Sequence, residues 1–176
     1  MPRSTVYWLW ALGAAGLLYL LSRTQAGMNV VANVTDAAAA LLVPRGIRNN
    51  NPGNITRVAG VTWQGQLTDA DLQLVNKRYD PQFVQFDTPA NGVRALGRIL
   101  QNYQRQGLTT VAQIIGRYSA TDQAAYIQNV SDALGISPND PVDVLSSLPA
   151  LAVAIIQQEC GQQPYNESDV AAWVYS

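Results

Sequence analysis

The sequence predicts a mostly α-helical α+β domain over residues 45–176, preceded by one N-terminal transmembrane helix. Three observations predict this class: a long uncharged apolar stretch near the N-terminus, a turn-rich segment with short alternating runs, and apolar stripes at helical spacing between capping residues. A chain of 176 residues fits one domain of ordinary size. The predicted division is an anchor at 1–27, a linker or stalk helix at 28–44 and the domain at 45–176.

Composition excludes several classes of function. The formal net charge is -1, and a protein that binds nucleic acid by neutralising phosphates needs a basic surplus, so nucleic acid is not an expected partner. The chain has no histidine, which excludes Ser-His-Asp and Cys-His triads and His-ligated zinc. The single cysteine, Cys160, cannot form an internal disulfide. No cofactor and no metal is expected.

The apolar stretch at residues 4–22 has no charge and lies between Arg3 and Arg23. At about 1.5 Å per residue it spans roughly the hydrocarbon core of a bilayer, and aromatic residues lie near both ends. A cleaved signal peptide and a buried core helix are the alternatives to an uncleaved anchor. The charge bias leans toward the main domain on the periplasmic side. Residues 28–44 then extend as a linker helix or lie on the membrane surface, up to Pro44.

The first part of the domain is rich in turns. Asn and Gly accept the left-handed backbone that tight turns require, as in the runs NNNPGN and VAGVTWQGQ. Short strands of a small antiparallel sheet are predicted at 54–57, 61–64 and 82–86.

The rest of the domain is predicted to be helical. Thr88 and Pro89 cap a helix that Gly107 closes, and Thr109 or Thr110 begins a shorter one. Thr121 or Asp122 begins a third helix, whose apolar positions are Tyr126, Ile127, Val130 and Leu134, with Gly135 as its C-cap.

The last predicted helix begins at Ser146 or Ser147, with Pro149 in its first turn and Gly161 after its end. Its apolar stripe comprises Leu148, Leu151, Ala152, Ile155 and Ile156, and the same spacing continues to Glu159. Apolar neighbours and the negative end of a helix favour the neutral form of a carboxyl group, which is the form that a general acid needs. The alternative to a buried general acid is that the Glu159 side chain points to water or pairs with Arg94 or Arg98.

The run AIIQQECG resembles the helix of lysozyme-superfamily lytic transglycosylases that ends in Glu-Ser-Gly, with cysteine in place of the serine. RGIRNNNPGNI, followed by W-x-G, F-x-x-F, GVRAL and Y-I-x-x-V, resembles a lysozyme-like domain of phage virion and lysis proteins over most of residues 45–165. The resemblance implies a lysozyme-like fold in which Glu159 is the single catalytic acid/base. In the family the glutamate helix precedes the sheet, whereas here it comes last, so a circular permutation is implied. The Gly-Leu-Met-Gln signature of the family is absent.

The number of carboxylates separates two mechanisms. A hydrolase with two carboxylates needs a second acid at a set distance, and the candidates Asp69, Asp71, Asp80 and Asp87 all lie in predicted turns or caps. In a lytic transglycosylase one acid suffices, because the 6-hydroxyl of the sugar closes the ring. The sparse set of acids favours this second route.

Five further residues are candidates for lining a glycan groove: Arg48, Asn51, Asn54, Trp63 and Tyr165. Each has a structural alternative, such as a turn role for the asparagines or a core position for the tryptophan. Cys160 is expected to be a small packing residue, because no base is available to activate its thiol.

These observations predict a membrane-anchored, phage-type enzyme that degrades peptidoglycan glycan strands during genome entry. Its location would be the virion or the host inner membrane, with the membrane itself and other virion proteins as partners. The alternative is a non-catalytic virion or membrane-associated assembly protein with a lysozyme-like fold.

Overall fold

The computed structural model describes residues 43–120 and 123–176. By its internal contacts the chain divides into two compact units, Met1–Val43 and Pro44–Ser176, and the description below concerns the second. The predicted transmembrane segment and stalk helix lie outside the described residues. None of the helices in the described ranges has both the length and the hydropathy needed to cross a membrane.

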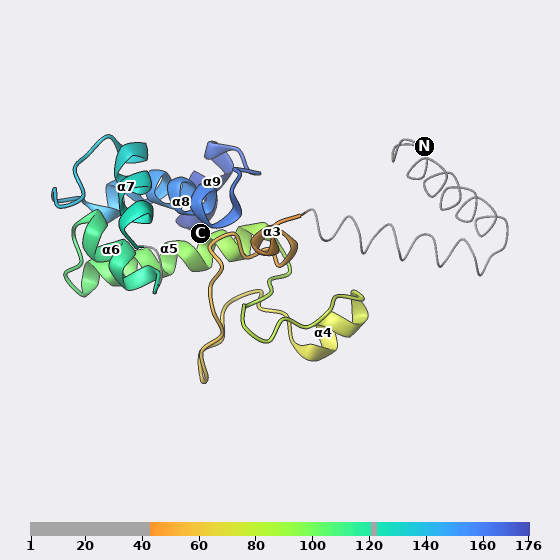
Figure 1. The fold of residues 1–176 in the computed structure, drawn as a ribbon. Helices are drawn as coiled ribbons and strands as arrows, with labels where there is room; N and C mark the ends of the chain where they lie inside the picture. The colour runs from red at the N-terminus through yellow and green to blue at the C-terminus, as the bar shows by residue number, and fades with distance from the viewer. Residues whose placement is uncertain (1–42, 121–122) are drawn as a thin grey trace, which may run out of the picture. The chain divides into compact units, whose positions relative to one another are not determined.

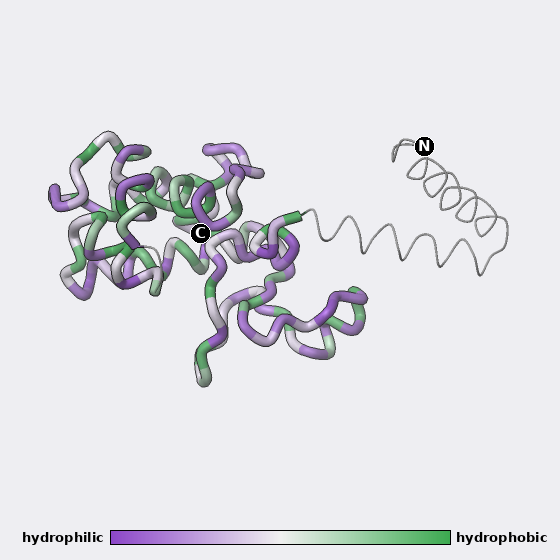
Figure 2. The backbone as a smooth tube through the Cα atoms, in the orientation of Figure 1, coloured by the Kyte–Doolittle hydropathy of each residue, from purple (hydrophilic) through white to green (hydrophobic). Residues whose placement is uncertain are grey.

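The unit is mostly helical, as predicted, and its helices are shown in Figure 1. They are α3 (Arg45–Arg48), α4 (Asp69–Leu74), α5 (Pro89–Arg105), α6 (Val111–Tyr118), α7 (Gln123–Leu134), α8 (Val144–Cys160) and α9 (Glu167–Val174). Helix α8 is central, because it packs against α3, α5, α7 and α9. Figure 2 shows that its residues are predominantly hydrophobic. Six of its side chains are fully buried. One is Val144, and the other five confirm the predicted stripe: Leu148, Leu151, Ala152, Ile155 and Ile156.

Several predicted caps are confirmed. The Thr88 side chain accepts a hydrogen bond from the backbone of Asn91 at the start of α5, with Pro89 as the first helical residue. Thr110 caps α6 in the same way, through the backbone N–H of Gln113. The caps predicted for α7 at Thr121 or Asp122 lie outside the described residues.

The start of α8 was predicted wrongly. The helix begins at Val144, where Asp143 accepts a hydrogen bond from the Leu145 backbone, so Pro149 lies in the helix interior. A proline there cannot donate to the carbonyl four residues earlier. That carbonyl, of Leu145, instead accepts a hydrogen bond of 2.7 Å from the Tyr175 hydroxyl. Tyr175 is the C-cap residue of α9. A side chain from another part of the unit therefore donates to the carbonyl that Pro149 leaves without a backbone donor.

The predicted strands at 54–57, 61–64 and 82–86 are also wrong, since no strand is formed among the described residues. The segments make only isolated antiparallel bridges, between Thr56 and Phe83 and between Gln66 and Phe86. Left-handed backbone at Asn54 (φ 47°) and Gly65 (φ 70°) interrupts the extended conformation beside both bridges. Residues 84–86 are all buried, so this run packs as a loop and does not alternate between two faces.

Three short helices were not predicted: α3, α4 and α9. Helix α4 has a capping box in which Thr68 and Asp71 bond each other's backbone. Helix α9 packs closely on α5, where a Cβ on Gly97 would come within 2.5 Å of the Val174 carbonyl oxygen. The core formed by these elements is one cluster that extends from Ile55 to Val174.

Candidate active site around Glu159

Glu159 lies half-buried in the last turn of α8, on the side that continues the buried stripe. The helix ends directly afterwards, because Gly161 adopts the left-handed conformation (φ 66°). The carboxyl group is therefore attached to the rigid central helix and still reaches solvent. Such a position suits a group that exchanges a proton with a bound substrate.

Two side chains from other elements hold the two oxygens of this carboxyl group. The Tyr126 hydroxyl on α7 donates to Oε1 at 3.0 Å. The Asn54 amide donates to Oε2 at 2.9 Å and also approaches the Glu159 backbone carbonyl at 3.3 Å. With one donor on each oxygen, the plane of the carboxyl group is fixed.

Tyr126 is a residue that sequence reasoning assigned to the core, and its ring is indeed buried, with 5% of its surface exposed. Burial, the neighbouring Tyr118 and the charge of Glu159 raise the pKa of the Tyr126 phenol. Its hydroxyl therefore stays protonated and remains a donor to Glu159. A tyrosine among apolar positions was the only signal available in the sequence, because the hydroxyl needs a partner wherever the ring is buried.

The segment 52–54 brings Asn54 to this position. Asn54 has a left-handed backbone (φ 47°), which turns the chain toward α8. The Tyr118 hydroxyl on α6 donates to the Gly53 carbonyl, and the Cys160 thiol donates to the Pro52 carbonyl at 3.4 Å. The segment is thus held by hydrogen bonds to two helices, α6 and α8.

Helix α3 packs against the same place. A Cβ on Gly46 would lie 3.0 Å from both the Asn54 Oδ1 and the Cys160 sulfur, so only glycine lets α3 approach this closely.

Cys160 is buried and free. Burial, together with the charge of Glu159, raises the pKa of its thiol to about 11. A thiol in this state is a poor nucleophile at neutral pH, in keeping with the predicted packing role.

The other predicted binding residues are not gathered at Glu159 by any hydrogen bond that the structure shows. Asn51 is fully buried, and its amide bonds the backbone of Ile55 and Val84, so its polar groups are used within the loop. Arg48 is exposed on α3, and Trp63 is half-buried against the core.

Tyr165 follows α8 and packs edge-on against Trp173, with ring centroids 5.5 Å apart. Its hydroxyl is buried and has no hydrogen-bond partner among the described residues. Burial, followed by the charge of Cys160, raises its pKa to about 12.

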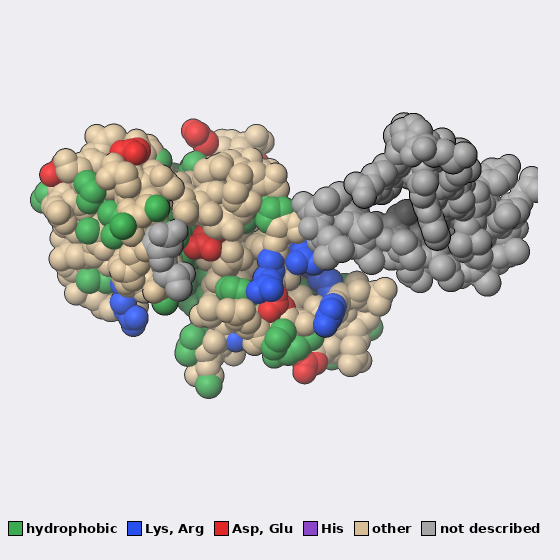
Figure 3. All heavy atoms as spheres, viewed as in Figure 1, with side chains coloured by type: hydrophobic (Ala, Val, Ile, Leu, Met, Phe, Trp, Pro, Cys, Tyr) green, Lys and Arg blue, Asp and Glu red, His purple; other side chains and the backbone are tan. Residues whose placement is uncertain are grey.

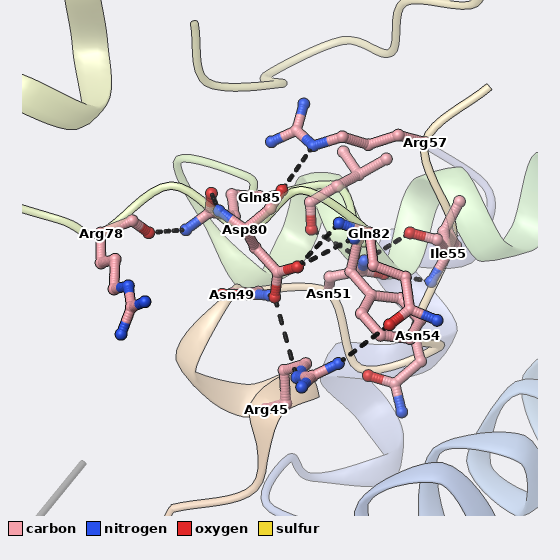
Figure 4. A network of polar contacts seen from close by, with 12 residues as sticks. Arg45, Asn49, Asn51, Asn54, Ile55, Arg57, Arg78, Asp80, Gln82 and Gln85 are labelled. Carbon is pink, nitrogen blue, oxygen red and sulfur yellow. Dashed lines mark hydrogen bonds and ion pairs between the residues drawn. The ribbon is translucent and has the colours of Figure 1, made fainter. Parts of the chain in front are cut away.

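Three of the four candidate second carboxylates have structural roles. Asp71 belongs to the α4 capping box, and Asp87 accepts from the Thr88 backbone and the Asn91 amide. Asp80 accepts from the Asn49 amide at 2.9 Å and forms an ion pair with Arg45 at 3.8 Å, as Figure 4 shows. Burial acts to raise the pKa of Asp80, but the bonds from Asn49 and from the backbone, together with the Arg45 charge, lower it overall. Asp69 is exposed in the first turn of α4.

The arginines that could have paired with Glu159 are engaged elsewhere. Arg94 and Arg98 both donate to the Ser176 carbonyl, at 2.8 Å and 3.0 Å. Among the described residues no three cysteines or acidic side chains lie close enough to hold a metal ion.

A groove of about 950 Å³ lies between α7, α8 and α9. Its floor is formed by small apolar residues of α8, including Ala150, Val153 and Ala154, and amide side chains such as Gln157 and Gln158 lie along it. Glu159 is not among the lining residues, so the groove and the carboxyl group are separate features of α8.

Comparisons with known proteins give one informative relative. The chain is 36% identical over 132 residues to Protein P5 of Pseudoalteromonas phage PM2, which covers 72% of this chain and 77% of the relative. No family model matches the sequence.

Proposed function

The chain belongs to the same family as Protein P5 of Pseudoalteromonas phage PM2, a bacteriophage protein, and we propose that it cleaves peptidoglycan glycan strands with Glu159 as the catalytic acid and base. The observation that carries the proposal is the pair of donors on the Glu159 carboxyl group, Tyr126 on one oxygen and Asn54 on the other. The resemblance of residues 45–165 to lysozyme-like phage domains supports the same class of reaction.

The chemistry needs a proton to move twice. Protonated Glu159 donates to the glycosidic oxygen as the bond to the leaving sugar breaks. The resulting carboxylate then accepts the proton of the 6-hydroxyl as that oxygen attacks the anomeric carbon and closes a 1,6-anhydro ring. Tyr126 and Asn54 both donate to the carboxyl oxygens, so they complement the anion that acts as the base.

The structure favours this route over hydrolysis, because three of the candidate second carboxylates have structural roles in caps and turns: Asp71, Asp80 and Asp87. A hydrolase would need a second carboxylate to hold water or to attack the sugar, at a set distance from the first. The hydrogen bonds of these three aspartates serve the backbone and neighbouring side chains instead.

We place the enzyme at a membrane, in the virion or at the host inner membrane, where it would open the cell wall during genome entry. The phage relative and the apolar stretch at 4–22 support this location. Removing residues 1–27 should move the protein from the membrane fraction to the soluble fraction with its helical content intact. Aggregation of the truncated chain would instead assign this stretch to the core.

The catalytic proposal is tested by zymography on peptidoglycan with the wild-type chain and Glu159→Gln. Glu167→Gln is the matched control, since Glu167 is exposed at the start of α9. We expect clearing by the wild type and the control and none by Glu159→Gln. Equal clearing by all three would remove Glu159 from the mechanism. No clearing by any of them would favour a structural protein with this fold.

A further inference from the structure

Tyr118, the last residue of α6, holds the backbone directly before Asn54. Its hydroxyl donates to the Gly53 carbonyl. The contact depends on the absence of a side chain, because a Cβ on Gly53 would lie 2.6 Å from the Tyr118 hydroxyl oxygen. Burial, followed by the charge of Glu159, raises the pKa of the Tyr118 phenol, so the hydroxyl stays protonated and remains a donor. The carbonyl that precedes Asn54 therefore has a fixed direction.

The peptide plane between Gly53 and Asn54 is held by hydrogen bonds at both of its ends. The Gly53 carbonyl accepts from Tyr118. The Asn54 N–H donates to the Asn51 carbonyl at 2.9 Å. Because a peptide unit is planar, these two bonds fix its orientation. Asn54 then adopts the left-handed backbone (φ 47°), which is disfavoured for most residues with a Cβ and here sets the direction of the Asn54 side chain.

The turn over residues 51–54 has Pro52 and Gly53 at its centre. A Pro-Gly pair suits a type II turn, in which the glycine has a positive φ, but Gly53 does not adopt a positive φ. Both central carbonyls accept hydrogen bonds from helices, that of Pro52 from the Cys160 thiol and that of Gly53 from Tyr118. The Pro-Gly sequence allows more than one form of turn, so these contacts from α6 and α8 stabilise the form that is observed.

The geometry of the two donors on Glu159 matters because no cation pairs with its carboxyl group in the part of the chain that the structure describes. Residues 118–176 contain no Lys or Arg, and the ion pair formed by the described residues joins Arg45 and Asp80. On the face drawn in Figure 3, Lys and Arg side chains gather mainly around α3 and α4. The carboxylate form of Glu159 therefore depends on hydrogen bonds from Tyr126 and Asn54, whose strength depends on distance and angle.

From these contacts we infer that Tyr118 is a positioning residue for Glu159, acting through the turn and the side chain of Asn54. The Tyr118 hydroxyl bonds the backbone, whereas Tyr126 and Asn54 donate to the carboxyl oxygens themselves. Without this hydroxyl the turn loses one of its supports, and the Asn54 amide is no longer held 2.9 Å from Glu159 Oε2. A reacting group works best when the residues around it are themselves held in place. The consequence for catalysis rests on the function proposed above for Glu159, whereas the arrangement itself does not.

The test uses the full chain in detergent micelles, with carbon-13 at the side-chain carboxyl group of glutamate. The chain contains two glutamates, Glu159 and Glu167, so the NMR spectrum has two carboxyl signals, and Glu167→Gln assigns them. The signals are compared in the wild type, Tyr118→Phe, Asn54→Ala and the double variant. Tyr103→Phe is the matched control, because Tyr103 is also half-buried against the core, and its hydroxyl makes no hydrogen bond to the turn among the described residues. Circular dichroism checks that each variant is folded.

We expect Tyr118→Phe to move the Glu159 signal in the same direction as Asn54→Ala does. Added to Asn54→Ala, it should produce no further movement. The Glu167 signal should stay in place throughout, and the control should move neither signal. If Tyr118→Phe does not fold, Gly53→Ala disturbs the same contact from its other side and should move the Glu159 signal likewise. An unmoved Glu159 signal would overturn the inference, and so would an equal movement with and without Asn54, since Tyr118 would then act on the carboxyl group directly.

Peptidoglycan cleavage provides the second measurement. Losing one hydrogen bond between neutral groups should lower kcat about two- to ten-fold in Tyr118→Phe, with KM nearly unchanged, because the effect falls on the chemical step. A wild-type kcat in this variant would overturn the positioning role. An inactive wild-type chain would instead refute the proposed function, and the carboxyl signals would still decide whether Tyr118 positions Glu159.

Discussion

Pro149 and Tyr175 form a pair whose energetic coupling can be measured directly. Pro149 cannot donate to the Leu145 carbonyl, and the Tyr175 hydroxyl donates to it at 2.7 Å. Tyr175→Phe removes this hydrogen bond and leaves the ring in place. A net loss of about 1 kcal/mol in the free energy of unfolding is expected, which lowers Tm by roughly 3 to 5 °C for a unit of this size.

The same substitution should cost almost nothing when Pro149 is first replaced. In Pro149→Ala the new backbone N–H bonds the Leu145 carbonyl, so Tyr175 no longer has a required acceptor. Pro149→Ala alone should raise the free energy of unfolding, by at most about 3 kcal/mol, because proline is disfavoured in a helix interior. The coupling energy between the two sites is then about 1 kcal/mol.

The assay is urea unfolding of the four members of this double-mutant cycle, followed by circular dichroism at the helix band. The cycle isolates the pair because each substitution leaves the other contacts of α8 in place. If Tyr175→Phe destabilises the wild type and the Pro149→Ala variant equally, the hydroxyl does not substitute for the missing amide, and the account of α8 is refuted.

Three further predictions concern the site. In Tyr126→Phe, Glu159 Oε1 has no donor, so the carboxylate that develops as the glycosidic bond breaks loses a stabilising hydrogen bond. Such a bond to a charged group contributes about 1.5 to 3 kcal/mol, and its loss from the transition state should lower peptidoglycan clearing at least about ten-fold. Clearing at the wild-type rate would show that Tyr126 only fills space. Digestion in oxygen-18 water should give 1,6-anhydro ends without the heavy isotope, read by mass spectrometry, whereas labelled reducing ends would indicate hydrolysis and a second carboxylate. The pKa of the Cys160 thiol is raised to about 11, so the group stays protonated below that pH. Alkylation of the native chain should therefore be slow at neutral pH and accelerate toward pH 11. Labelling at neutral pH as fast as in the urea-unfolded chain would contradict this prediction.

The helices that the sequence predicted well are those whose ends are set locally. Thr88 and Thr110 bond backbone groups three residues away, so a short window of sequence contains the whole interaction. The start of α8 is also capped locally, by Asp143, but the proline at position 149 pointed to a later start. Its apparent first-turn proline is tolerated in the interior through Tyr175, which is 30 residues from the acceptor.

The small sheet was overpredicted for a different reason. Alternation in 82–86 suggested one buried and one solvent face, yet Val84, Gln85 and Phe86 are all buried. Gln85 is accommodated because its side chain bonds the Arg78 carbonyl and the Asp80 N–H. A buried polar side chain that bonds the backbone of an irregular loop five and seven residues earlier is not visible as an alternating pattern along the chain.

The candidate site was predictable in part. Helical spacing places Glu159 beside the buried stripe, and Asn54 was among the candidates that the turn-rich segment offered. Tyr126 was missed, because an aromatic residue in an apolar stripe is most simply interpreted as a core residue. Its hydroxyl comes within hydrogen-bond distance of Glu159 only because α7 packs on α8.

The hydrogen bond between Asn54 and Glu159 joins residues 105 positions apart. Residues so distant meet late, since the chain between them must first be ordered and the entropy of closing a long loop must be overcome. During synthesis on the ribosome, Asn54 emerges well before α8 exists. The carboxyl group therefore acquires its support only when nearly the whole unit has been made, and a chain interrupted before α8 has neither the acid nor the central helix that carries it.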